Sequence, residues 1–203
     1  LLSRLPIRAE AAVDYTGFLW ADLPSALLPP GMGAEERALQ RLSSVNQWQV
    51  GLDLPDGTKL ELLAWGATPP VFDGPEDRNG RRNHDEAAFW LRLLDGALPL
   101  DPPQAPFVLL GDANLDTQDG DGPSEALPAL PSDPRLQDPV PRAAEVSPEP
   151  DHKGDPALDT AFYAKGPGGL RVDYILPSAG LRVTGAGVMR PQTGPLAEAL
   201  AAV

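Results

Sequence analysis

The sequence predicts a mixed α/β fold, of the α+β kind, because strand-like and helix-like segments alternate along the chain between long loops. Its 203 residues include 20 glycines and 25 prolines, which favours a loop-rich domain over a helical bundle. A hydrophobic content of 42% is too high for a disordered chain. No apolar run of about 18 residues exists that could span a membrane.

The first half of the chain predicts a short helix and a hairpin. Residues 35–42 carry apolar side chains on one side and predict the helix. Residues 48–54 and 59–65 predict two strands, since apolar and polar positions alternate, and the Pro-Asp-Gly-Thr segment at 55–58 can reverse the chain between them.

A polar loop and a long helix are predicted next. Residues 68–82 are dense in Pro, Gly and Asp and predict the loop. Asn83 matches a helix N-cap, with Glu86 three residues later completing a capping box. We expect the helix to continue through Leu94 and to end near Gly96.

The second half predicts strands around a long proline-rich segment. Residues 107–110 form a wholly apolar strand of the kind that is buried on both faces. Residues 116–150 contain few apolar clusters and predict a surface insertion. Residues 172–176 predict another buried strand, 181–184 a further strand, and 196–202 a terminal helix.

The charge balance limits the classes of function. With 16 basic and 29 acidic residues the net charge is -13, so a broad electrostatic hold on a nucleic-acid backbone is not expected. An acidic chain suits the binding of divalent cations, or simply solubility. The absence of cysteine excludes disulfides, thiol nucleophiles and cysteine-based zinc sites.

The first candidate residues are Asp112 and Asn114, which follow the apolar strand at 107–110. Ligand sites of open sheets usually lie at such strand ends. The aspartate could bind a hard cation or take a proton from water, and the asparagine could donate a hydrogen bond to a phosphoryl oxygen. The alternative is an Asx turn of purely local origin.

The second candidate is Asp173, which lies within the apolar strand at 172–176. A carboxylate there must be paired, bound to a metal or exposed at the rim, because burial of an isolated charge is costly. The alternatives to a functional role are an ion pair with Arg171 or another arginine, and a side chain that faces solvent.

The third candidate group is Arg78, Arg81 and Arg82, which precede the predicted helix N-terminus and could bind a substrate phosphate. His84, one of two histidines, is counted with the catalytic candidates. The alternative is a solvated loop whose arginines pair with its own acidic residues. His152, the other histidine, lies in a polar loop and is interpreted as a surface residue.

Three segments together resemble a known superfamily. Residues 108–114 (VLLGDAN) are similar to a strand followed by Gly-Asp-x-Asn, and 171–176 (RVDYIL) to an Arg-hydrophobic-Asp-Tyr strand. Residues 2–7 (LSRLPI) are similar to a Leu-Ser-Arg-x-Pro-Ile strand. In this order they resemble the endonuclease/exonuclease/phosphatase superfamily, which includes DNase I-like nucleases. Residues 68–86 resemble a bacterial subgroup of uncharacterised, often exported members.

The resemblance implies a DNase I-like two-layer β-sandwich flanked by helices, with the site at the mouth between the sheets. The chain would be one partial domain over 1–203, with the proline-rich insertion at about 116–150. Asp112 would bind a divalent metal, Mg²⁺ or Mn²⁺ with Ca²⁺ as a third option, or activate the attacking water. Asn114 would steady the phosphoryl group, and Asp173 would orient a catalytic histidine or help hold the metal.

The sequence also departs from the family pattern. The family's first catalytic Asn and metal-binding Glu precede the Leu-Ser-Arg strand, and its closing His motif would follow Val203, so we expect a fragment or processed chain. A family histidine at the end of the strand at 59–65 is replaced by Gly66.

Two functions follow from these observations. The first is a metal-dependent phosphoester hydrolase, a phosphodiesterase, nuclease or phosphatase, acting on a small phosphoester or a short nucleic acid. We expect activity in the parent protein and weak or no activity in this piece. The alternative is a catalytically inactive relative that serves as a binding or scaffolding module, as Gly66 favours. No protein partner is predicted, and a periplasmic or secreted location is an expectation from the subgroup alone.

Overall fold

The computed structural model describes residues 3–104, 106–120, 125–146, 151–191 and 193–201. Leu2 of the motif at 2–7 and Ala202 of the expected terminal helix lie outside these residues. So do residues 121–124 and 147–150 of the expected insertion.

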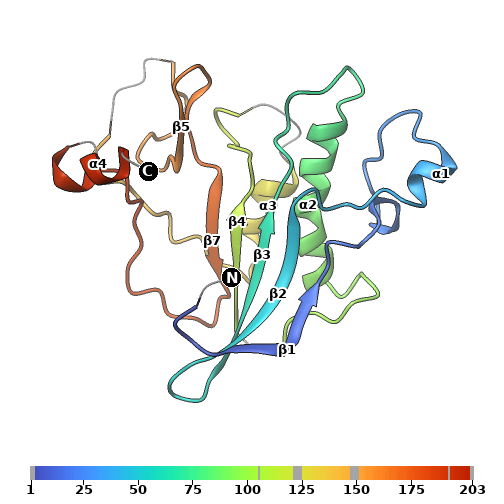
Figure 1. The fold of residues 1–203 in the computed structure, drawn as a ribbon, viewed down its shortest axis with the longest axis horizontal. Coiled ribbons are helices and arrows are strands. Elements are labelled where there is room, and N and C mark those ends of the chain that lie inside the picture. Colours follow the sequence, from blue (N-terminus) through green and yellow to red (C-terminus); the bar gives the residue numbers. More distant parts are fainter. Residues whose placement is uncertain (1–2, 105, 121–124, 147–150, 192, 202–203) are drawn as a thin grey trace.

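A five-stranded sheet forms the centre of the fold, with strand order β1-β2-β3-β4-β7 (Figure 1). Strands β3 and β4 are parallel, and the other neighbours are antiparallel. The strands are β1 (Ile7–Asp14), β2 (Asn46–Asp53), β3 (Lys59–Gly66), β4 (Phe107–Asp112) and β7 (Asp173–Pro177). Strands β5 (Ala161–Tyr163) and β6 (Gly168–Leu170) form a separate two-stranded ribbon.

Helices surround the sheet, so the expected mixed α/β class with helices flanking a central sheet is confirmed. They are α1 (Ala34–Arg37), α2 (Arg78–Leu94), α3 (Ala126–Ser132) and α4 (Gly194–Ala201), with a 3-10 turn η1 at Trp20–Asp22. In the described part of the chain, no helix is both long and apolar enough to cross a membrane.

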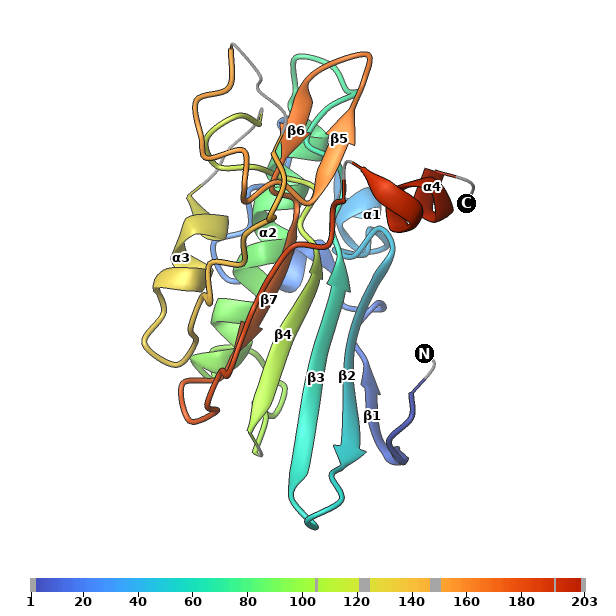
Figure 2. The same cartoon turned by 90° about the vertical axis from the view of Figure 1, so that its left-hand side faces the viewer.

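Helices α2 and α3 cover one face of the sheet (Figure 2). Phe89 and Trp90 of α2 are fully buried in the same apolar cluster as Leu63 of β3 and Leu109 of β4. Leu130 of α3 joins this core. Because side chains alternate along a strand, the chain neighbours of Leu63 in β3 and of Leu109 in β4 point away from the helices. The face of the sheet that they form is here called the open face.

The open face is less well covered than the helix face. Trp48 of β2 and Ile175 of β7 are among its exposed large apolar residues. Apart from isolated bridges, the described strands outside the main sheet are those of the β5–β6 ribbon. The ribbon lies at the end of the sheet where β7 begins (Figure 2), and the second layer of a sandwich stays a prediction.

Several predicted elements are confirmed. The hairpin is formed by β2 and β3, and the Leu54 amide donates to the Thr58 carbonyl at 2.8 Å across the turn. The strands expected at 107–110 and 172–176 are β4 and β7, and the terminal helix is α4. Neither strand is fully buried on both faces, however, since Val108 and Leu110 of β4 are half-buried and Asp173 and Ile175 of β7 are exposed.

The predicted start of the long helix is wrong. Helix α2 begins at Arg78, and its N-cap is Asp77, so the segment 78–82 is helical rather than a loop. Asn83 lies inside the helix and is buried, and its side chain bonds to other segments instead of capping. The carboxylate of Glu86 accepts hydrogen bonds from Ser44 and Thr68, so no capping box exists.

Three smaller expectations also need correction. The helix expected at 35–42 is the single turn α1, after which the chain turns so that Leu39 is exposed and Leu42 is buried. Residues 181–184 form no strand, because they have no ladder partner. The surface interpretation of 116–150 fails for helix α3, which buries Leu127 and Leu130 against the core. The assignment of 1–203 to a single domain stays a prediction.

Candidate functional site

The register of the sheet places four residues side by side at one end. Asn46 pairs with Gly66, Gly66 with Asp112, and Asp112 with Asp173, across strands β2, β3, β4 and β7. Directly paired residues of neighbouring strands share a face of the sheet. Leu109 faces the helices, so this set, here called the end row, lies on the open face. The structure thus brings Asp112 and Asp173 together.

The segment after β4 is shaped by a close approach between strands. A Cβ atom at Gly111 would lie 1.9 Å from the Trp65 carbonyl oxygen, so only glycine fits there. The Ala67 amide donates to the Asp112 carbonyl at 2.8 Å, and the Ala113 amide donates to the Val172 carbonyl at 2.7 Å. These contacts fix the backbone of Asp112 relative to both neighbouring strands.

Asp112 and Asn114 form a local turn, as the alternative interpretation of this motif expects. The Asn114 amide donates to Asp112 Oδ1 at 2.8 Å, and Asn114 Nδ2 donates to Oδ2 at 3.0 Å. Asn114 Nδ2 also donates to the Ala67 carbonyl at 2.9 Å. Asn114 has a φ of 50°, which asparagine tolerates better than most residues. The Asx turn therefore holds the Asp112 carboxylate in place at the end row.

The electrostatics of the end row suit a cation. Partial burial raises the pKa of Asp112, and the negative charge of Asp173 raises it further, while hydrogen bonds from Asn114 act in the opposite direction. Carboxylate oxygens are the donors that Mg²⁺ and Mn²⁺ prefer. Among the described residues no group of three or more His, Asp or Glu side chains could hold a metal. The end row therefore offers the two carboxylates of Asp112 and Asp173, on neighbouring strands.

Asp173 faces solvent, as one of its alternative interpretations expects. The expected ion pair with Arg171 is not formed, because Arg171 pairs with Asp138 through contacts of 2.9 and 2.8 Å. The hydroxyl oxygen of Thr160 accepts hydrogen bonds from the amides of Asp173 and Val172. Thr160, on the segment leading into β5, therefore fixes the start of β7.

Asn83, which the sequence predicted to be a helix N-cap, is instead a positioning residue for the candidate site. Its Nδ2 atom donates to the Ala113 carbonyl at 2.7 Å and to the Thr68 carbonyl at 2.8 Å. Ala113 lies between Asp112 and Asn114, so this buried amide ties helix α2 to the candidate site. The sequence does contain a signal for this role, because Asn83 is a polar residue at a position where the helix otherwise carries apolar residues.

The three candidate phosphate-binding arginines do not converge on the end row. Arg78 pairs with Glu36, and Arg81 Nε donates to the Glu76 carbonyl at 3.1 Å. Arg82 Nε donates to the Leu42 carbonyl at 2.7 Å. None of these partners is an acidic side chain of the loop, so the alternative in which the arginines pair with the loop's own acidic residues is not what the structure shows. A phosphate site at Arg78, Arg81 and Arg82 stays a prediction.

His84 is also separate from the end row in its contacts. Its Nδ1 atom lies 2.9 Å from Asp85 Oδ1, and Asp85 is buried. The other Asp85 oxygen accepts hydrogen bonds from Trp20 Nε1 and the Leu27 amide, each at 2.6 Å. Asp85 thus anchors the segment around η1, and a catalytic role for His84 stays a prediction.

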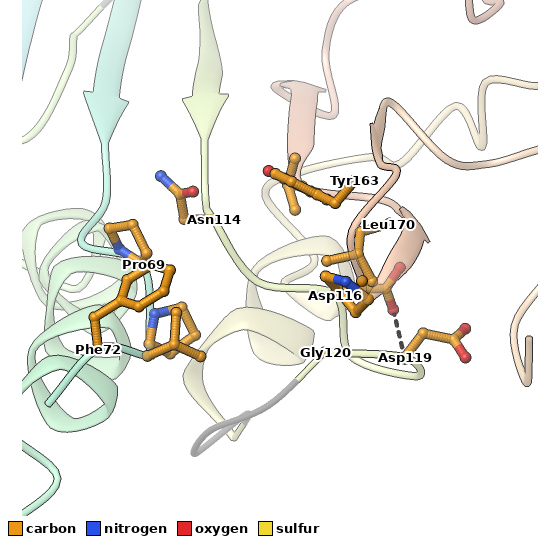
Figure 3. Close-up of a pocket in the computed structure, with 13 residues that line it drawn as sticks. Pro69, Phe72, Asn114, Asp116, Asp119, Gly120, Tyr163 and Leu170 are labelled. Carbon is orange, nitrogen blue, oxygen red and sulfur yellow. Dashed lines mark hydrogen bonds between the residues drawn. The ribbon is translucent and has the colours of Figure 1, made fainter. Parts of the chain in front are cut away.

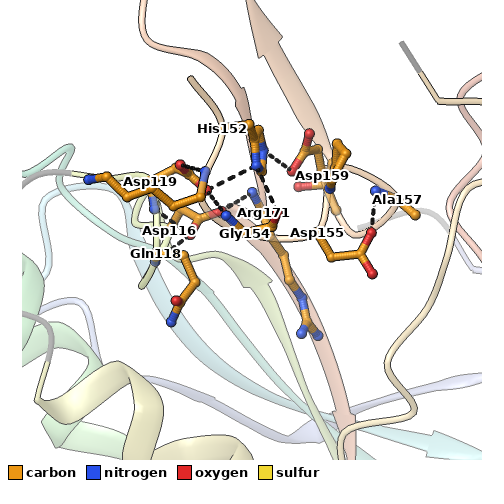
Figure 4. Close-up of polar contacts among 12 residues, drawn as sticks. Asp116, Gln118, Asp119, His152, Gly154, Asp155, Ala157, Asp159 and Arg171 are labelled. Carbon is orange, nitrogen blue, oxygen red and sulfur yellow. Dashed lines mark hydrogen bonds and ion pairs between the residues drawn. The ribbon is translucent and has the colours of Figure 1, made fainter. Parts of the chain in front are cut away.

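The interpretation of His152 as a surface residue is wrong, since its side chain is only 5% exposed. Its Nδ1 atom lies 3.2 Å from Asp119 Oδ2, and its Nε2 atom lies 3.2 Å from Asp159 Oδ1 (Figure 4). Burial lowers the pKa of His152, but the two carboxylates outweigh it, so the pKa is raised above its ordinary value. The paired acids make burial of this ring possible.

Asp116 completes the polar contacts next to the site (Figure 4). Its Oδ1 atom accepts the amides of Gln118 and Asp119, and its Oδ2 atom accepts the Arg171 amide at 2.7 Å. Asp116 follows Asn114 by two residues, and Arg171 precedes Asp173 by two. The carboxylate therefore joins the two segments that carry the site.

A pocket of about 350 Å³ opens beside Asn114 (Figure 3). Its lining is mainly apolar, and it is bounded by the segment 69–72 on one side and by the β5–β6 ribbon on the other. Neither segment was singled out by sequence reasoning as a pocket wall.

No match was found among curated proteins. Among solved structures, sphingomyelinase C from Streptomyces griseocarneus is similar at 18% identity and a TM-score of 0.50, covering 94% of this chain and 53% of that one. This chain therefore spans about half the length of that protein.

Two further structures are similar at lower scores. An endonuclease/exonuclease/phosphatase from Beutenbergia cavernae DSM 12333 is 17% identical, with a TM-score of 0.48 and coverage of 87% of this chain and 39% of that one. The human Nocturnin catalytic domain with a bound sulfate anion is 14% identical, with a TM-score of 0.42 and coverage of 88% and 50%.

The family model described as "Endonuclease/Exonuclease/phosphatase family" matches residues 1–195. This range includes the Gly-Asp-x-Asn segment, the Arg-hydrophobic-Asp-Tyr strand and the Leu-Ser-Arg-x-Pro-Ile segment. The resemblance drawn from those motifs is thereby confirmed, and the chain belongs to the endonuclease/exonuclease/phosphatase family.

Proposed function

We propose that the protein hydrolyses phosphoesters in a reaction that depends on a divalent metal, with the end row as its reaction centre. The observation that carries this proposal is the direct pairing of Asp112 with Asp173 on the open face of the sheet. Membership of the family supports the class of reaction.

The metal would be held by Asp112 and Asp173. Two carboxylates on neighbouring strands repel each other, and a cation between them would remove that repulsion. Mg²⁺ commonly binds through one or two carboxylates and completes its coordination with water and substrate phosphate, which fits two protein donors. When bound, the ion supplies Lewis-acid stabilisation of charge on the phosphoryl oxygens.

The remaining chemistry falls to the side chains beside it. Asp112 takes a proton from the water whose oxygen forms a bond to phosphorus, while the bond from phosphorus to the leaving oxygen breaks in line; the leaving oxygen keeps the electron pair and takes a proton from solvent water. The Asn114 amide exchanges its bond to Asp112 for one to the phosphoryl oxygen as negative charge grows there. Loss of one such donor costs a rate factor of about 10²–10³.

A second candidate function is a catalytically inactive binding module. Gly66 favours it, because this residue lies directly beside Asp112 in the end row and has no side chain to transfer a proton. Loss of one acid–base group lowers the rate by about 10²–10⁴.

The substrate class is a small phosphoester or a short oligonucleotide. The net charge of -13 argues against a long duplex, whose backbone needs an excess of basic residues for tight binding.

The test is the hydrolysis of bis-p-nitrophenyl phosphate by the full-length gene product with Mn²⁺, Mg²⁺ or EDTA. We expect metal-dependent turnover, and we expect Asp112→Ala to lower kcat/KM by about 10²-fold or more. The matched control is Asp56→Ala, which removes an exposed carboxylate in the β2–β3 turn at the opposite end of these strands and should leave turnover unchanged.

Two results would count against the proposal. Turnover that is equal in the wild-type protein and in Asp112→Ala would move the chemistry away from the end row. If neither the diester nor p-nitrophenyl phosphate is turned over, the binding module becomes the better function.

A further inference from the structure

The pocket beside Asn114 has two apolar walls that face each other (Figure 3). Pro69 and Phe72 lie on one side, and Tyr163 and Leu170 lie on the other. Its volume of about 350 Å³ is at the lower end of the range for small-molecule pockets, about 300–1,000 Å³. The space suits one ring system rather than a long flexible chain.

Phe72 occupies an unusual position on the rim of this pocket. Its side chain is 93% exposed, and its φ of 68° lies in the left-handed region that bulky residues rarely adopt. The backbone on both sides is fixed by Asn79, whose Nδ2 donates to the Val71 carbonyl at 2.7 Å and whose amide donates to the Asp73 carboxylate. An exposed aromatic ring on a strained and well-held stretch of backbone indicates a surface kept for a ligand.

Tyr163 links the pocket to the end row. Figure 3 shows its ring opposite Phe72, directed toward Asn114. Asn114 lines the same pocket, and its Nδ2 atom donates to Asp112 Oδ2 at 3.0 Å, so the pocket borders the end row. A molecule that contacts Tyr163 can reach the proposed reaction centre.

The charges in the lining indicate what the pocket does not bind. None of the described lining residues is a lysine or an arginine. Its two carboxylates, Asp116 and Asp119, already accept hydrogen bonds from backbone amides of the protein. An anionic phosphate thus has no cationic partner among the described lining residues, whereas an uncharged flat group can contact the apolar side chains of Pro69, Phe72, Tyr163 and Leu170.

We propose that this pocket binds the uncharged aromatic substituent of the substrate, an aryl ring or a nucleobase, with Phe72 and Tyr163 as the residues that determine this specificity. The inference rests on the proposed function, which places the phosphorus at the end row. It narrows the substrate to phosphoesters that carry a flat aromatic group next to the phosphate, and it excludes acyl-chain phospholipids.

The test compares the binding of methyl phenyl phosphate, methyl cyclohexyl phosphate and methyl octyl phosphate. Calorimetry with the full-length wild-type protein in EDTA measures binding without turnover, because the proposed reaction requires the metal. We expect the phenyl compound to bind on the order of tenfold more tightly than the other two, because a flat ring stacks against aromatic walls. Phe72→Ala and Tyr163→Leu, measured in the same way, should remove this preference.

Phe162→Ala is the matched control, since Phe162 is an exposed aromatic residue on the same ribbon but does not line this pocket. It should keep the preference. Equal or undetectable binding of the three compounds, tighter binding of the octyl compound, or a preference that survives in Phe72→Ala would overturn the inference. Turnover by the wild-type protein is measured separately. A retained preference without turnover counts against the proposed function alone, and turnover without a preference counts against this inference alone.

Discussion

The two faces of the five-stranded sheet are stabilised in different ways. On the helix face, Leu63, Leu109 and Leu176 are almost completely buried against α2 and α3. On the open face, Ile175 is 60% exposed and Trp48 is 39% exposed, although both belong to the same strands as buried residues. Apolar packing is therefore concentrated on one side of the sheet.

This difference explains where the charged residues can lie. Asp112 and Asp173 repel each other, and the core could not accommodate such a pair without a compensating partner. On the open face they remain accessible to water and to a cation, while packing on the other face fixes the strands that carry them. The helix face therefore supplies stability, and the open face carries the proposed reaction centre.

The strongest test of this comparison uses two neighbouring residues of β7. Leu176→Ala should lower the free energy of unfolding by about 3 kcal/mol, because it leaves a cavity in the core. Ile175→Ala, on the open face, should lower it by less than about 1 kcal/mol. Urea denaturation measures both. Equal losses would show that the open face is packed in solution as tightly as the helix face.

A smaller effect is expected beside the site, where polar contacts replace apolar packing. His152→Gln should lower the free energy of unfolding by about 2 kcal/mol at pH 5.5, because Asp119 and Asp159 lose a charged partner. The folded-state pKa of His152 is raised. Its stabilisation is thus fully present below the ordinary value of about 6.5 and is lost as pH rises through the raised pKa.

The measurement is the unfolding free energy of wild type and variant from pH 5.5 to pH 9. The difference between them should shrink as pH rises. Leu176→Ala is the control, because the cost of a core cavity does not depend on histidine ionisation. A His152→Gln cost that is constant with pH would show that the ring acts through shape rather than charge.

Much of the fold follows from local patterns in the sequence. The apolar runs at 107–110 and 172–176 and the hairpin with its Pro-Asp-Gly turn are visible from the residue types alone. The start of α2 was missed because its first turns are polar, and their partners, such as Glu36 for Arg78 and Leu42 for Arg82, come from a distant segment. The residues Asn83 and Glu86 match the pattern of a capping box, but in the structure both side chains bond to other segments of the chain.

For the candidate site too, the residues themselves follow from local patterns in the sequence, but their arrangement depends on contacts between distant segments. Asp112, Asn114 and Asp173 could be proposed because strand ends and charged residues within apolar strands are local signals. Their pairing depends on the order of strands that are about 60 residues apart, which no local pattern records. The burial of His152 between Asp119 and Asp159, and the facing of Phe72 and Tyr163, depend likewise on loop contacts between distant segments.

The smallest change in stability is expected at Gly66, where the open face can be tested for chemistry directly. A Cβ atom there would lie 3.3 Å from Asn46 Oδ1 and 3.5 Å from Val45 Cβ, so a side chain fits after a shift of a few tenths of an ångström. Gly66→His should change the free energy of unfolding by no more than about 0.5 kcal/mol. It should raise metal-dependent turnover of bis-p-nitrophenyl phosphate by about tenfold or more, because an imidazole then stands beside Asp112 in the end row.

Gly66→Gln is the control, since its amide fills similar space but cannot transfer a proton. An equal rate in the two variants would mean that the end row gains nothing from an acid–base group at this position, and the chemistry assigned to the open face would then have to rest on Asp112, Asn114 and Asp173 alone.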